Sequence, residues 1–125
     1  MIDRLSLEGS KNPNFVGCWM MKNASICDNL IEIFEYKKNT HRPGLVGDGI
    51  ARETVKKSTD IAISPHDLED ESFSDVSSYI EHLKVCYLDY LEQWDFLKSF
   101  LPKVHIGQFN IQKYDEGGHF RRLHS

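Results

Sequence analysis

The side chains best suited to chemistry lie in the last twelve residues of the chain. Tyr114 precedes His124 by ten positions, and the pair Gly117-Gly118 lies between them. A neutral imidazole is a usual nitrogen ligand for iron, and a phenol can donate a hydrogen bond to a carboxylate. Two adjacent glycines permit the backbone angles of a tight turn beside a site. The spacing therefore indicates a strand-like run, a glycine turn and a histidine after it, and the imidazole and the phenol are the side chains here with the means for chemistry.

Each candidate also has a plainer interpretation. His124 could be a frayed terminal residue, and Tyr114 could be a packed strand tyrosine. His119 precedes His124 by five residues, which puts the two on opposite faces of a regular strand, so we do not expect a shared metal. The other histidines are expected on loops or at exposed positions: His41, His66, His82 and His105.

Two further motif-like segments do not predict a site. Ser58 lies near Asp60, but no histidine is placed by sequence to complete a catalytic triad. The run from Gly44 to Gly49 lacks the Lys-Ser/Thr pair of a phosphate-binding loop.

The elements that must position Tyr114 and His124 follow from hydrophobic periodicity and turn residues. We expect one domain over 1–125, with a loose leader over 1–13. The predicted elements are a strand over Phe15–Met21, a helix over 25–38, a loop over 39–50, a strand over Val55–Ile63 ended by Pro65, an acidic solvated loop over 67–75, a helix over 75–99 and a half-buried strand over Val104–Tyr114.

The helix over 75–99 carries the strongest pattern. Apolar and aromatic residues recur at helical spacing: Val76, Tyr79, Ile80, Leu83, Tyr87, Tyr90, Leu91, Trp94 and Leu97. Charged residues mostly occupy the complementary face: Glu81, Lys84, Asp89, Glu92 and Asp95. One apolar stripe predicts a helix that lies across a sheet, with Leu83 and Leu91 among its main packing residues.

Composition excludes several classes of function. A net charge of -4 gives no electrostatic footprint for nucleic acid. No apolar run approaches the roughly 20 residues that span a membrane, and the N-terminus lacks the apolar stretch of a signal peptide. Three widely spaced cysteines, Cys18, Cys27 and Cys86, favour neither a disulfide framework nor a zinc site. We therefore expect a cytoplasmic protein.

Four segments in order resemble the prolyl 4-hydroxylase-like Fe(II)/2-oxoglutarate dioxygenases. The segment Tyr114–His124 resembles the metal-binding strand of that family, and this is the specific part of the resemblance. Ser25–Ile31 is similar to its early helix, Lys56–Thr59 to the basic-Ser start of its first core strand, and the helix over 75–99 to its long supporting helix.

The resemblance implies roles for two residues. His124 would be the first Fe(II) ligand, and Tyr114 would hydrogen-bond the 2-oxoglutarate co-substrate. In the family the second ligand is an Asp or Glu two positions after the histidine, which here would be position 126. Several prolyl 4-hydroxylases place the tyrosine nine residues before the histidine, so the register differs by one. The basic residue that grips the far carboxylate of 2-oxoglutarate follows the distal histidine in the family.

The resemblance also implies a fold and an activity. We expect the N-terminal part of a double-stranded β-helix, a jelly roll, with two supporting helices, truncated at the metal motif and inactive alone. The parent would hydroxylate a carbon centre of a peptide or small-molecule substrate. The alternative is a non-catalytic α+β module that binds a protein through an uncovered apolar strip of the helix over 75–99.

Overall fold

The computed structural model describes residues 2–7, 15–101 and 103–122. Its strands are β1 (Ile2–Arg4), β2 (Trp19–Met21), β3 (Arg42–Pro43), β4 (Lys56–Lys57), β5 (Thr59–Ile63), β6 (Phe109–Lys113) and β7 (His119–Phe120). Its α-helices are α1 (Ser25–Tyr36), α2 (Ser74–Gln93) and α3 (Leu97–Phe100), and its 3-10 helices are η1 (Lys38–Thr40), η2 (Pro65–Glu69) and η3 (Glu71–Phe73). The predicted mixture of helices and strands is confirmed.

The strands of the described residues form small antiparallel sheets. One has the order β3-β5-β6, and β1-β2 and β4-β7 are separate pairs. In the β5-β6 ladder Asp60 is opposite Gln112 and Ile61 is opposite Ile111. Because side chains alternate between the faces of a strand, Ile61 and Ile111 share one face, and Asp60 and Gln112 share the other.

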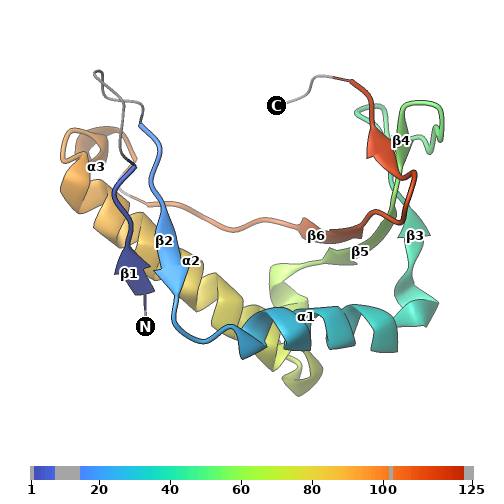
Figure 1. The fold of residues 1–125 in the computed structure, drawn as a ribbon, viewed down its shortest axis with the longest axis horizontal. Coiled ribbons are helices and arrows are strands. Elements are labelled where there is room, and N and C mark those ends of the chain that lie inside the picture. The colour runs from blue at the N-terminus through green and yellow to red at the C-terminus, as the bar shows by residue number, and fades with distance from the viewer. Residues whose placement is uncertain (1, 8–14, 102, 123–125) are drawn as a thin grey trace.

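The hydrophobic core lies where α1 and α2 meet the apolar face of this sheet (Figure 1). Phe34 of α1, Ile61 and Ile63 of β5 and Val76 of α2 are buried together. Fully burying an isoleucine or phenylalanine stabilises the fold by about 1.5–3 kcal/mol. The β5-β6 ladder is therefore held against the helices by its apolar face, and its polar face is directed away from them.

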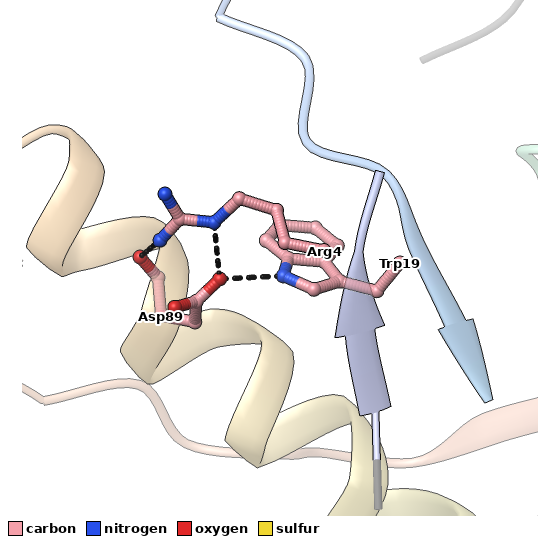
Figure 2. Close-up of polar contacts among 3 residues, drawn as sticks. All are labelled: Arg4, Trp19 and Asp89. Atoms are coloured by element: carbon pink, nitrogen blue, oxygen red, sulfur yellow. Dashed lines mark hydrogen bonds and ion pairs between the residues drawn. The ribbon is translucent and has the colours of Figure 1, made fainter. Parts of the chain in front are cut away.

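Within the loose leader predicted over 1–13, Ile2–Arg4 form β1, so the prediction is wrong for these residues, while residues 1 and 8–13 lie outside the described part of the chain. β1 pairs with β2 in the register Arg4 opposite Trp19. Figure 2 shows how Asp89 of α2 anchors this pair: its Oδ2 accepts hydrogen bonds from Arg4 Nε and Trp19 Nε1, both at 2.6 Å. β1 forms because the backbone of β2 pairs with it and because the Asp89 carboxylate binds the side chain of Arg4.

The strand predicted over Phe15–Met21 is shorter than expected. Only Trp19–Met21 is extended and paired, and Phe15 has φ of 54°, in the left-handed region that a strand excludes. The Phe15 ring instead lies 4.7 Å from the Trp94 ring at the end of α2, centroid to centroid. Phe15 therefore packs against an aromatic ring that is far away in the sequence, and it does not adopt strand geometry.

The helix predicted over 75–99 ends earlier and buries less than expected. α2 stops at Gln93, and a separate turn of helix, α3, follows. Val76 and Leu91 are buried, but Leu83 is 51% exposed, so its prediction as a main packing residue is wrong. Val76 contributes to the core with β5, whereas Leu83 lines a groove beside Ile106. None of the described helices is both long and apolar enough to cross a membrane.

Three other predicted segments are also corrected. Within the predicted loop over 39–50, β3 pairs with β5. The strand predicted over Val55–Ile63 divides at Ser58, because β4 pairs with β7 while β5 pairs with β3 and β6. The acidic segment over 67–75 forms η2, η3 and the start of α2, and Leu68 and Phe73 pack on the core.

The strand predicted over Val104–Tyr114 is extended and paired only in β6. Its predicted alternation holds there: Phe109 and Ile111 are half-buried, and Asn110 and Gln112 are exposed.

Candidate functional site

The segment around Tyr114 forms a strand, a turn and a second strand. After β6 the Gly118 N–H donates to the Asp115 carbonyl at 2.7 Å, which closes the turn. β7 then runs antiparallel to β4, with His119 opposite Lys57 and Phe120 opposite Lys56. The Arg121 N–H donates to the Val55 carbonyl at 2.8 Å and extends this pairing by one residue. The arrangement predicted around the glycine pair is confirmed within the described residues.

The two glycines of this turn have different tasks. Gly117 has φ of 78°, a conformation that glycine adopts without a steric penalty. Gly118 has an ordinary φ, but a Cβ on it would lie 2.8 Å from the Asp115 carbonyl oxygen and 2.9 Å from the Lys57 carbonyl oxygen. Gly118 is therefore required for the close approach of the turn to β4.

Tyr114 lies directly after β6, and it is 41% exposed. Its hydroxyl makes no hydrogen bond to any of the described residues. This phenol is thus accessible to a ligand. His124, the predicted iron ligand, lies outside the described residues.

The sequence analysis missed a polar cluster on β4, β5 and β6, which has the buried charge pair of Lys56 and Asp60 at its centre. Asp60 accepts hydrogen bonds from Ser58 Oγ at 2.7 Å and from Gln112 Nε2 at 2.9 Å. Lys56 Nζ lies 3.4 Å from Asp60 Oδ2, and Lys56 and Asp60 are each only 5% exposed. The Lys56 ammonium also lies 5.3 Å from the centre of the Phe120 ring. A buried charge pair of this kind is stable only when further hydrogen bonds satisfy it, as they do here.

A sequence signal for this cluster does exist. In an extended chain Lys56, Ser58 and Asp60 share one face because they are two residues apart, so the sequence places these three polar side chains together. The missing information was the partner strand, because Gln112 is 52 residues away from Asp60 in the sequence.

His119 has a structural task in this region. Its Nε2 lies 2.9 Å from the Glu53 carbonyl oxygen, and its Nδ1 lies 3.2 Å from the Gly117 carbonyl oxygen. A neutral imidazole can donate to only one of these two acceptors. His119 therefore ties the turn to the segment before β4.

A cleft of about 420 Å³ lies beneath the turn, beside the ends of β3 and β6. The described residues that line it are His41, Arg42, Pro43, Glu53, Lys57, Ser58, Thr59, Lys113, Asp115, Glu116 and Gly118, and Tyr114 is not one of them.

Lys113 on this cleft also contacts α1 through Glu35. The hydrogen bond from Lys113 lowers the pKa of Glu35, and the same bond raises the pKa of Lys113. Both groups are therefore held in their charged forms, and they fix β6 against α1.

In the part of the chain that the structure describes, no three His, Cys, Asp or Glu side chains gather closely enough to hold a metal ion. No protein-family model matches this chain, and no curated protein or solved structure matches it.

Proposed function

We propose that this chain forms part of an Fe(II)/2-oxoglutarate-dependent dioxygenase of the prolyl 4-hydroxylase-like type. The observation that carries the proposal is the connection from β6 to β7. Tyr114 is 41% exposed, and its hydroxyl makes no hydrogen bond to the residues that the structure describes; a glycine turn and then β7 follow it, and His124 comes after β7 in the sequence. The resemblance implies this order along the chain: a tyrosine that binds the co-substrate, a glycine turn and a histidine that binds the metal.

Each of the two residues has one task in this proposal. His124 contributes an imidazole nitrogen to Fe(II), as one of the two histidines and one carboxylate that such sites use. Tyr114 donates its phenolic hydrogen bond to a carboxylate of 2-oxoglutarate and so orients the co-substrate. When bound, iron and 2-oxoglutarate would supply an oxidation by dioxygen, in which one oxygen atom hydroxylates the substrate carbon and the other enters the succinate that remains after 2-oxoglutarate loses carbon dioxide. No residue within 1–125 is assigned as an acid or base.

We propose in addition that the sheets belong to the N-terminal part of a jelly roll. The support is the two-faced character of the β3-β5-β6 sheet: Ile61 and Ile63 contact the helices, and Asp60 and Gln112 occupy the opposite face. In a jelly roll the face opposite the helices would be directed toward a second sheet. Such a fold leaves a polar interior in which a small co-substrate and a peptide or small-molecule substrate could bind.

A cytoplasmic setting remains part of this proposal. Cys18, Cys27 and Cys86 are all free thiols, which a reducing compartment preserves.

A non-catalytic protein-binding module is the second candidate, because α2 exposes apolar side chains. Leu83 and Leu88 are 51% and 53% exposed. Two adjoining grooves of about 390 and 620 Å³ share Ile80, Leu83 and Ile106. Exposed apolar surface of this kind often marks an interaction site.

Two measurements separate these candidates. The first reads the residue encoded directly after Ser125 in the natural gene, where the oxygenase proposal expects Asp or Glu at position 126 and a later histidine. The second measures succinate release from 2-oxoglutarate by the natural full-length protein and by its His124→Ala variant. Turnover that disappears in the variant supports the oxygenase. Any other residue at position 126, together with no turnover, supports the binding module.

A further inference from the structure

The connection between α3 and β6 has an unpaired backbone. Ile63, the last residue of β5, is opposite Phe109 of β6, so residues 103–107 lie beyond the end of β5. Figure 1 shows the connection as a run without helical turns. None of the backbone N–H or carbonyl groups of residues 103–107 hydrogen-bonds to the residues that the structure describes. Unpaired groups in a row are a template for pairing with another strand.

An apolar groove of about 620 Å³ lies between this connection and α2. α2 contributes Leu83, Tyr87 and Leu88 to it, and the connection contributes Val104 and Ile106. Leu88 is 53% exposed and Val104 is 55% exposed. A segment in the groove would therefore meet apolar side chains and unpaired backbone together. This is the setting of β-augmentation, in which main-chain hydrogen bonds give affinity and alternate side chains give specificity.

The charges around the groove favour an acidic occupant. Glu81 and Lys84 of α2 lie 3.6 Å apart and pair with one another. Lys103 also lines the groove, and it makes no ion pair with any residue that the structure describes. No acidic residue occurs between positions 103 and 112. A carboxylate of the occupant would therefore meet a cation that no described group neutralises.

A second copy of this chain fits the groove less well than an acidic peptide does. Pairing of residues 103–107 with the same residues of another copy would bring no carboxylate to Lys103, because neither segment contains one. Lysine on an unpaired strand edge is also a usual device against self-association. The charge pattern therefore favours a segment of a different protein.

We propose that the groove between α2 and residues 103–107 binds an extended acidic peptide of a partner protein by β-augmentation. The peptide pairs with the backbone of residues 103–107, packs apolar side chains on Leu83 and Leu88, and places a carboxylate beside Lys103. Because side chains alternate along a strand, the partner segment alternates apolar and acidic residues. This inference goes beyond the oxygenase proposal and rests on the second candidate function, to which it adds the chemistry of the partner.

Titration of the chain 1–125 with synthetic peptides tests the proposal. The probe is a fluorescein-labelled peptide with the sequence Glu-Val-Asp-Ile-Glu-Val-Asp-Leu and blocked ends, and fluorescence anisotropy measures its binding. It should bind saturably, with one peptide per chain. Raised ionic strength should weaken the binding, because salt screens exposed charges. The same peptide with lysine at each acidic position should not bind measurably.

Backbone methylation of the probe separates β-augmentation from other binding modes. Along a paired strand, alternate residues exchange hydrogen bonds with the partner strand. Methylating the amide nitrogens of one alternate set should therefore abolish binding, and methylating the other set should preserve most of it. Amide hydrogen exchange locates the contact: the amides of residues 104–107 should exchange more slowly in the complex, and the amide of Gly47 in a distant loop should be unchanged.

Variants of exposed residues test the charge and the apolar contact. Lys103→Glu should weaken binding of the acidic peptide about tenfold, since it removes one exposed attraction and adds one repulsion, and it should allow the lysine peptide to bind. Lys38→Glu makes the same charge change in η1 and should have no comparable effect. Leu88→Ala should weaken binding, whereas Leu45→Ala, at a similarly exposed leucine of a loop, should not. Circular dichroism checks the fold of each variant.

The proposal is overturned if the acidic peptide does not bind saturably, if the lysine peptide binds equally well, or if both methylated peptides bind as the parent does. Equal affinities of Lys103→Glu and Lys38→Glu would also reject it. A dimer in sedimentation, with slow exchange at residues 104–107, would assign the groove to a second copy instead. Succinate release plays no part in these measurements, so the oxygenase proposal and this inference fail separately.

Discussion

Arg4 contacts both the side chain and the backbone of Asp89. Its Nε donates to the Asp89 carboxylate at 2.6 Å, and its Nη2 donates to the Asp89 carbonyl oxygen at 3.1 Å (Figure 2). Trp19 Nε1 donates to the same carboxylate oxygen as Arg4 Nε. One aspartate of α2 therefore fixes both strands of the β1-β2 pair.

This contact predicts an acid-sensitive contribution to stability. The hydrogen bond from Arg4, and then that from Trp19, hold the pKa of Asp89 below its usual range. A carboxylate whose folded pKa is lowered stabilises the fold above its unfolded pKa, and this contribution is lost as pH falls through the folded value. Wild type should exceed Asp89→Asn in stability near neutral pH, and the difference should shrink as the pH falls below about 4.

Urea unfolding from about pH 7 to about pH 3 checks this prediction. Glu32→Gln, which removes an exposed carboxylate of α1, is the control and should show no comparable pH-dependent difference from wild type. A difference between wild type and Asp89→Asn that stays constant over the whole range would contradict the assignment.

Leu91 and Leu83 should respond differently to truncation. Leu91 is 8% exposed and Leu83 is 51% exposed. Leu91→Ala should therefore destabilise the chain by about 2–5 kcal/mol, as for other buried leucines, and Leu83→Ala by less than about 1 kcal/mol. Denaturant unfolding of the two variants gives both values, and equal losses would mean that Leu83 is covered in solution.

Gly118→Ala should destabilise the site more than Gly107→Ala. A Cβ on Gly118 would collide with two carbonyl oxygens of the backbone, whereas a Cβ on Gly107 would meet nothing within 4 Å. Overpacking of this kind typically costs about 1–3 kcal/mol, and an alanine at an unstrained glycine can stabilise by about 0.4–1 kcal/mol. Thermal and urea unfolding compare the two, and equal stability of the variants would reject the close approach of the turn to β4.

The chain 1–125 should bind Fe(II) or Mn(II) only weakly. In the proposed site, most ligands come from residues that follow His124, and one imidazole leaves the ion mostly hydrated. Calorimetric titration of Mn(II) measures the affinity directly. Micromolar one-to-one binding that persists in His124→Ala would reject His124 as the ligand.

Tyr114→Phe should raise the apparent KM for 2-oxoglutarate more than it lowers turnover in the natural full-length protein. The variant loses one hydrogen bond to a charged group, worth about 1.5–3 kcal/mol, or roughly one to two decades in affinity. His124→Ala should instead abolish turnover. The measurement is succinate release at varied 2-oxoglutarate concentration. An unchanged dependence on 2-oxoglutarate would make Tyr114 a structural residue and would show that the family register across Gly117-Gly118 is wrong.

The local sequence pattern was sufficient to predict several features of the secondary structure. α1 starts at Ser25 as predicted, β5 stops before Pro65, and Phe109 and Ile111 alternate with Asn110 and Gln112. The glycine turn after Tyr114 was also predicted from sequence. In each case the cause is short-range, since propensity, side-chain alternation and turn geometry act over a few residues.

Other features depend on contacts between residues that are far apart in the sequence, so only the tertiary structure decided them. The Ile2–Arg4 strand needs Trp19–Met21 beside it and Asp89 beneath it. α2 ends at Gln93 where Trp94 meets Phe15, a contact that no local pattern encodes. The Asp60 cluster likewise forms only when β6 is placed against β5, because a buried charge is tolerated only with its partners in place.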